Sequence, residues 1–68
     1  MSNSAFNKDV NATNVSDYII EYEEGNLDGA HTIKLFQYLL DSGLVWQLQG
    51  SYQRVMKCLL DDGYLVRR

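Results

Sequence analysis

Apolar residues recur at helical spacing in three stretches of the chain. The first and last stretches carry them at positions i, i+3, i+4 and i+7: Val15, Tyr18, Ile19 and Tyr22, and then Tyr52, Val55, Met56 and Leu59. The middle stretch, about residues 29–42, has a wider apolar face made of Ile33, Leu35, Phe36, Leu39 and Leu40. Residues at these spacings share one side of an α-helix. The pattern predicts an all-α fold, a small domain of three to four helices.

Glycines mark the ends of the predicted helices. The motif Leu-Leu-Asp-x-Gly occurs twice, ending at Gly43 and at Gly63, and Gly25 follows the first helix. A glycine just past a helix takes the left-handed conformation, and the next apolar residue packs back onto the last turn. We therefore expect left-handed backbone angles at Gly43 and Gly63. Leu44 and Tyr64 should pack against the helices that they follow.

Polar residues that can cap a helix precede each stretch. The side chain of an N-cap residue accepts hydrogen bonds from backbone N–H groups of the first turn. Asp28 is the predicted cap of the second helix, and Ser51 that of a third helix over 51–61. Either Asn14 or Ser16 can cap the first.

Residues 44–49 fit two patterns. Leu44, Trp46 and Leu48 alternate as in a strand. Leu44, Val45 and Leu48 also fit one turn of a helix. Because an isolated pair of strands is only marginally stable, we favour a short helix. Trp46 is expected in the core, where its large apolar surface would be buried.

Residues 1–14 lack a helical pattern. They hold four asparagines together with serine and threonine, whose side chains compete for backbone hydrogen bonds. We expect a flexible, disordered tail over 1–14 and a single helical domain over 15–68.

Charge is distributed unevenly along the chain, which has a net charge of −3. Residues 1–30 hold six acidic side chains and one basic one, whereas residues 31–68 hold three acidic and five basic ones. Proteins that bind nucleic acid carry a basic footprint, so this balance argues against general nucleic-acid binding. No apolar run approaches the roughly 20 residues that a membrane helix needs, and we expect no membrane association. The single cysteine, Cys58, fits a reducing setting and is expected in the core.

No arrangement of residues indicates catalysis. The sequence lacks a glycine-rich phosphate loop and a recognisable set of nucleophile, base and orienting acid. One acidic cluster has none of the ligand spacing of a known metal site: Glu21, Glu23, Glu24 and Asp28. His31 is isolated and is expected at the surface. We therefore expect a protein that is not an enzyme and has no cofactor or metal.

One block in the second half of the chain carries a resemblance. It reads Leu35-Phe36 and then Asp41-Ser42-Gly43-Leu44-Val45-Trp46-Gln47-Leu48-Gln49-Gly50-Ser51-Tyr52-Gln53-Arg54, and Tyr22-Glu23-Glu24-Gly25 precedes it. Over about residues 17–64 the chain resembles a family of small proteins encoded by tailed bacteriophages. Many relatives have Gly where this chain has Gln53, so the start of the last helix can differ. The resemblance implies a phage origin and the host cytoplasm as the setting, without implying an activity.

A protein-binding module is the function that we favour, one that docks on a host or phage protein. Trp, Tyr and Arg are the residues that most often anchor interfaces. The expected contact residues surround the start of the third helix: Gln47, Gln49, Gln53, Arg54 and Lys57. A simpler role for Arg54 is an ion pair with an acid such as Asp41 or Glu24. The wide apolar face of the second helix also allows homo-oligomerisation.

The alternative function is that of a helix-turn-helix-like DNA-binding protein. Gln53, Arg54 and Lys57 would then face the major groove. Few cations are available to contact phosphates, and this disfavours the alternative.

Overall fold

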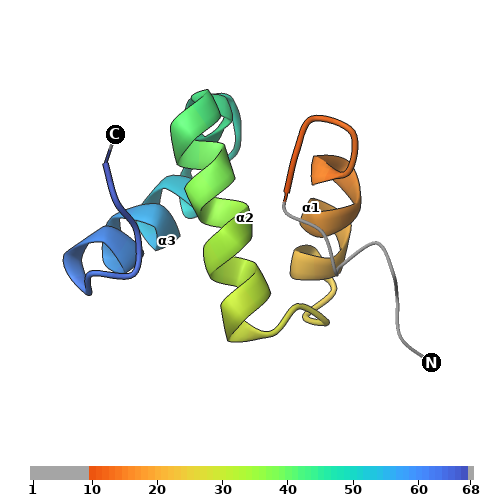
Figure 1. Cartoon of the computed structure of the whole chain (residues 1–68), viewed down its shortest axis with the longest axis horizontal. Coiled ribbons are helices and arrows are strands. Elements are labelled where there is room, and N and C mark those ends of the chain that lie inside the picture. The colour runs from red at the N-terminus through yellow and green to blue at the C-terminus, as the bar shows by residue number, and fades with distance from the viewer. Residues whose placement is uncertain (1–9, 68) are drawn as a thin grey trace. The chain divides into compact units, whose positions relative to one another are not determined.

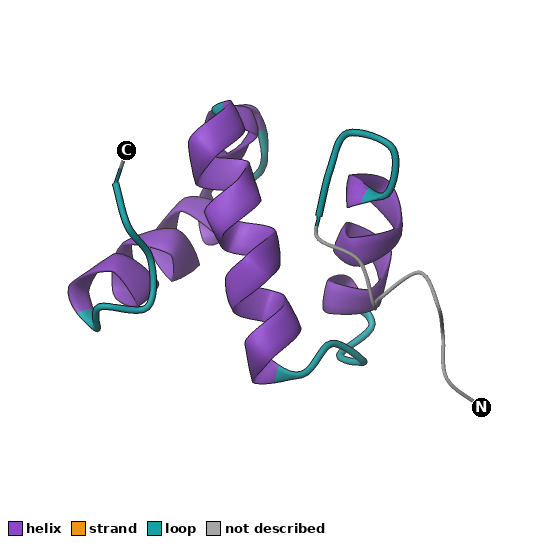
Figure 2. Cartoon of the chain, in the orientation of Figure 1, coloured by secondary structure: helices purple, strands orange, loops and turns teal. Residues whose placement is uncertain are grey.

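The computed structural model of the chain describes residues 10–67 (Figure 1). Within this range it has three α-helices, α1 (Val15–Glu23), α2 (Gly29–Ser42) and α3 (Gly50–Asp61), and one 3₁₀ helix, η2 (Leu44–Gln47). Residues 10–67 contain no strand (Figure 2). The all-α prediction is confirmed, as is the short helix favoured for the ambiguous stretch. Residues 1–9 of the predicted tail lie outside the described residues.

The last residues of the predicted tail form a turn that leads into α1. The side-chain oxygen of Asn11 accepts hydrogen bonds from the backbone N–H groups of Thr13 and Asn14, at 2.8 and 3.1 Å. The Asn14 side chain in return accepts the Asn11 N–H at 2.8 Å. Asn14 is the N-cap residue of α1 but makes no side-chain bond to the first turn. Asparagine side chains bond to nearby backbone groups, and for this reason we predicted a tail without helix. In residues 11–14 the same bonds form a local turn.

Contacts between residues divide the chain into two units, residues 1–35 and 36–68, and the boundary falls within α2. In the first unit, Val15 and Tyr18 of α1 and Leu35 of α2 are buried. The Tyr18 ring lies 6.3 Å from the imidazole of His31, measured between centroids. The amphipathic stripe of α1 therefore points inward, as its spacing predicts. That residues 15–68 form one domain stays a prediction.

The second unit has a larger buried set. It comes from the second half of α2, from η2, from α3 and from the C-terminal segment: Phe36, Leu39, Val45, Tyr52, Met56 and Leu65. The rings of Phe36 and Tyr52 stack with centroids 5.9 Å apart and an angle of 24° between their planes. Both residues belong to the predicted apolar faces, so the spacing of apolar residues identified the inner sides of α2 and α3.

Glycines end all three α-helices. Gly25, Gly43 and Gly63 have φ angles of 78°, 81° and 84°, which confirms the left-handed conformation predicted at the last two. After α3, the backbone N–H of Gly63 bonds to the Leu60 carbonyl at 3.1 Å, and that of Tyr64 to the Leu59 carbonyl at 2.9 Å. These two bonds satisfy carbonyl groups that the last helical turn leaves without partners.

The side chain that returns to the core after α3 is Leu65, not Tyr64. Tyr64 is 58% exposed and Leu65 only 5%. The backbone of Tyr64 makes the predicted bond. That its side chain packs on the last turn of α3 stays a prediction. The C-terminal segment turns back from the end of α3 (Figure 1). Gln37 of α2 holds it there, since its amide accepts the Val66 N–H and donates to the Val66 carbonyl, each at 2.9 Å.

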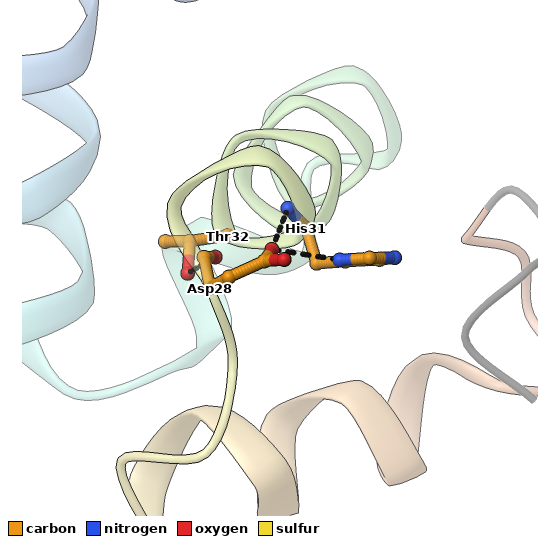
Figure 3. A network of polar contacts seen from close by, with 3 residues as sticks. All are labelled: Asp28, His31 and Thr32. Atoms are coloured by element: carbon orange, nitrogen blue, oxygen red, sulfur yellow. Dashed lines mark hydrogen bonds and ion pairs between the residues drawn. The ribbon is translucent and has the colours of Figure 1, made fainter. Parts of the chain in front are cut away.

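Asp28 caps α2 as predicted. Its carboxylate accepts the backbone N–H of His31 at 2.8 Å and contacts the His31 Nδ1 at 2.7 Å (Figure 3). The Thr32 hydroxyl donates to the Asp28 carbonyl at 2.7 Å. The first turn of α2 is thus fixed by side chains that lie within five residues of one another in the sequence.

Two other sequence predictions are corrected by the structure. Ser51 does not cap the third helix, because α3 begins one residue earlier, at Gly50, and its N-cap residue is Gln49. Ser51 instead lies exposed in the first turn. Cys58, expected in the core, is exposed. Its position in α3 is off the stripe of Tyr52 and Met56, so its neighbour Leu59 reaches further inward than it does.

Candidate functional site

The predicted contact residues lie on η2, α3 and the connection between them, all in the second unit. Gln47 and Gln49 are exposed on either side of Leu48, which is half-buried. Arg54 and Lys57 are exposed on the first two turns of α3. Residues three apart on a helix are neighbours on its surface, so these two cations lie next to each other.

Gln53 differs from the other four predicted residues. It is half-buried, and its side-chain amide donates a hydrogen bond of 3.4 Å to the Val45 carbonyl. Gln53 thereby joins α3 to η2. Lys57 follows Gln53 by one helical turn and lies on the adjacent part of the α3 surface.

Trp46 is at the surface, which corrects its assignment to the core. Its side chain is 57% exposed, whereas the neighbouring Val45 is fully buried. A 3₁₀ helix turns about 120° per residue, so adjacent residues cannot both face the core. The helical interpretation of this stretch grouped Leu44, Val45 and Leu48 on one side. Because this grouping does not include Trp46, it was the signal in the sequence that Trp46 lies on the exposed side.

We define the Trp46 surface as Trp46, Gln47, Gln49, Arg54 and Lys57. Its chemistry is one aromatic side chain, two amides and two cations. Residues 44–58, which contain it, include no aspartate or glutamate, and the next acid along α3 is Asp61, one helical turn after Lys57. Within the described part of the chain Arg54 makes no ion pair. Asp41, one of the acids considered as its partner, instead accepts a hydrogen bond from the Gln37 amide at 2.9 Å.

The polar cluster at the start of α2 has a structural role. The hydrogen bond from the His31 backbone, followed by that with the His31 side chain, lowers the pKa of Asp28 below its usual value of 3.8. Both contacts stabilise the ionised carboxylate at the positive end of the helix.

No group of three or more His, Cys, Asp or Glu residues within 10–67 is arranged to hold a metal ion. None of the helices described there is long and apolar enough to span a membrane.

Comparison with known proteins gives one match. The family model described as "Domain of unknown function (DUF7417)" matches residues 11–68. No curated protein and no solved structure matches the chain.

Proposed function

Since the chain belongs to the family described as "Domain of unknown function (DUF7417)", we propose its function from its own surface: a non-enzymatic protein-binding module. The resemblance to small phage proteins supports a host or phage protein as the partner and the host cytoplasm as the setting. Binding takes place at the Trp46 surface.

The exposure of Trp46 is the observation that carries this proposal. A tryptophan that stays 57% exposed leaves a large apolar area in water, although its neighbour Val45 is fully buried. Tryptophan and arginine dominate the energetics of protein interfaces, usually inside a ring of weaker polar contacts. Trp46 and Arg54 supply the anchors here, and Gln47 and Gln49 supply the polar contacts around Trp46.

DNA reading by a helix-turn-helix has less support. Residues 43–49 separate α2 from α3, whereas the turn of a helix-turn-helix has about three to four residues. Gln53 is one of the three residues that would face the major groove of DNA, but its side chain is hydrogen-bonded to the Val45 carbonyl. In the described residues the exposed cations of the second unit are Arg54, Lys57 and Arg67, which allow few phosphate contacts.

The test is capture of a partner by the tagged protein from host cells, with or without phage infection. Trp46→Ala and Arg54→Ala should each reduce partner recovery by at least about tenfold, which corresponds to about 1.4 kcal/mol. Gln49→Ala should reduce it less.

Tyr64→Ala is the matched control, because Tyr64 is an aromatic residue of equal exposure that lies outside the Trp46 surface. All variants should melt within a few degrees of wild type by circular dichroism. If Trp46→Ala recovers the partner as well as Tyr64→Ala does, the Trp46 surface is not the binding site.

A further inference from the structure

The charges of the segment that holds Trp46 indicate what kind of partner fits it. Residues 44–58 carry Arg54 and Lys57 and no acidic side chain, although the whole chain has a net charge of −3 and Asp61 follows Lys57 by one helical turn. Building on the proposed function, we propose that the Trp46 surface binds an acidic segment of its partner, with an apolar side chain of that segment against Trp46. Complementary charge at an interface steers encounter and selects against wrong partners.

The start of α3 adds to the positive character of this surface. Its N-cap residue is Gln49, whose side chain makes no capping bond to the first turn. The first turn of a helix carries the positive end of its dipole. In α3 the Tyr52 N–H of this turn bonds to the Gln49 carbonyl at 3.0 Å, and Arg54 and Lys57 follow on the same helix. The dipole therefore has the same sign as the two cations.

The two cations have complementary roles. Arginine presents a planar fork that binds a carboxylate through two parallel hydrogen bonds, whereas lysine acts as a compact charge. Arg54 and Lys57 are three residues apart, a rise of about 4.5 Å along the helix. Two carboxylates one or two residues apart in an extended segment, or one turn apart in a helix, match that spacing.

A protein segment suits this surface better than a nucleic acid does. Double-stranded DNA carries one charge per about 1.7 Å, and a chain with a net charge of −3 repels such a polymer over the whole molecule. A short acidic segment places only a few charges against the two cations. An exposed tryptophan can stack on a base, but here two cations would have to hold the backbone of the strand.

Selection from a displayed library of random peptides tests the proposal, with four forms of the full chain as bait. These are wild type, the double variant Arg54→Glu/Lys57→Glu, Trp46→Ala, and the control Arg67→Glu, which reverses an exposed cation outside the Trp46 surface. Selected peptides are then titrated individually. Trp46 is the only tryptophan of the chain, so its fluorescence reports binding at this surface directly.

Wild type and Arg67→Glu should select peptides rich in Asp and Glu that contain an apolar residue. Their binding should change the Trp46 emission and weaken at least tenfold from 0.05 to 0.5 M salt, because opposite charges are screened. The double variant should lose these peptides at least tenfold and select basic ones instead. Trp46→Ala should select none of the wild-type peptides.

Several results overturn the proposal. If wild-type peptides depend on Trp46 but have no acidic bias, the proposed function stands and the acidic partner is wrong. If no peptide is selected by wild type, the acidic segment is overturned, whereas the proposed function is decided by the capture of a partner from host cells. Displacement of selected peptides by a DNA oligonucleotide at lower concentration than by free acidic peptide would assign the surface to nucleic acid. Dimerisation of wild type in sedimentation, abolished in the double variant, would assign it to a second copy.

Discussion

At the scale of single residues, Asp28 shows how one side chain sets the start of a helix. Its carboxylate receives two hydrogen bonds from His31, and its pKa is lowered in the folded chain as a result. A group whose pKa falls on folding stabilises the fold above its unfolded pKa, and this stabilisation is lost as the pH falls through the folded pKa. The pH window for Asp28 therefore lies below about 4.

Replacing Asp28 by asparagine should reduce the sensitivity of the protein to acid. Asparagine keeps an oxygen that can cap the helix, but it does not titrate. We expect the wild type to lose more in melting temperature than Asp28→Asn between pH 5 and pH 2.5, by circular dichroism. Equal losses in the two proteins would mean that Asp28 does not contribute to acid unfolding.

Alanine substitutions at two glycines should change the stability of the protein in opposite directions, because the two backbone conformations differ. Gly63 has a positive φ, so Gly63→Ala should destabilise the protein by about 1 kcal/mol. Gly50 lies in the first turn of α3 without a positive φ, and no described atom beyond its immediate neighbourhood lies within 4 Å of the position a Cβ would take. Gly50→Ala should therefore stabilise by about 0.5 kcal/mol, since alanine loses less backbone entropy on folding. Urea unfolding measures both, and changes of the same sign would contradict the assignment.

At the scale of elements, the C-terminal segment after α3 belongs to the fold of the second unit. It combines one buried apolar side chain, Leu65, with a side-chain clamp on its backbone, formed by Gln37. The Gln37 amide also donates to Asp41 of the same helix, which fixes its orientation. A polar residue on the outer side of α2 thus holds a segment that lies 29 residues further along the chain.

Leu65 and Val66 form a matched pair for testing the C-terminal segment. Leu65→Ala should destabilise by about 2–3 kcal/mol, because it removes a side chain that is 5% exposed and leaves a cavity. Val66→Ala should change stability by less than about 0.5 kcal/mol, because Val66 is 60% exposed and Gln37 bonds only its backbone. Denaturant unfolding measures the change in stability of each variant. Equal effects of the two substitutions would contradict the buried position of Leu65.

At the scale of the whole molecule, few side chains provide the buried interior. In the described residues, those with the least exposure are Tyr18, Leu35, Phe36, Leu39, Val45 and Met56. Three of them lie on α2. A chain of 68 residues buries only about 60% of its unfolded surface, so each of these side chains accounts for a sizeable part of the stability.

Hydrogen exchange should reflect this distribution across the chain. We expect the slowest amide exchange in the centre of α2, residues 35–40, and in α3, because opening these helices exposes the most deeply buried side chains. The turn at residues 11–14 should exchange much faster, since its side chains are exposed or half-buried. Exchange measured by NMR that is slower at residues 11–14 than at 35–40 would contradict this order.

The sequence by itself determined the helices, the inner sides marked by their apolar stripes, the glycines that end them and the cap of α2. These features depend on local rules: the 3.6-residue period, the left-handed glycine and the capping of α2 by Asp28. Where the backbone departs from a regular α-helix, the spacing of apolar residues does not tell which of two neighbours is buried. Only the tertiary structure showed that Val45 is buried and Trp46 exposed, and that Leu65 is buried and Tyr64 exposed. The same applies to Gln53, whose bond to Val45 joins two elements and has no local signature. The candidate site follows this division: local pattern identified its polar residues, whereas the exposure of Trp46 was decided by packing.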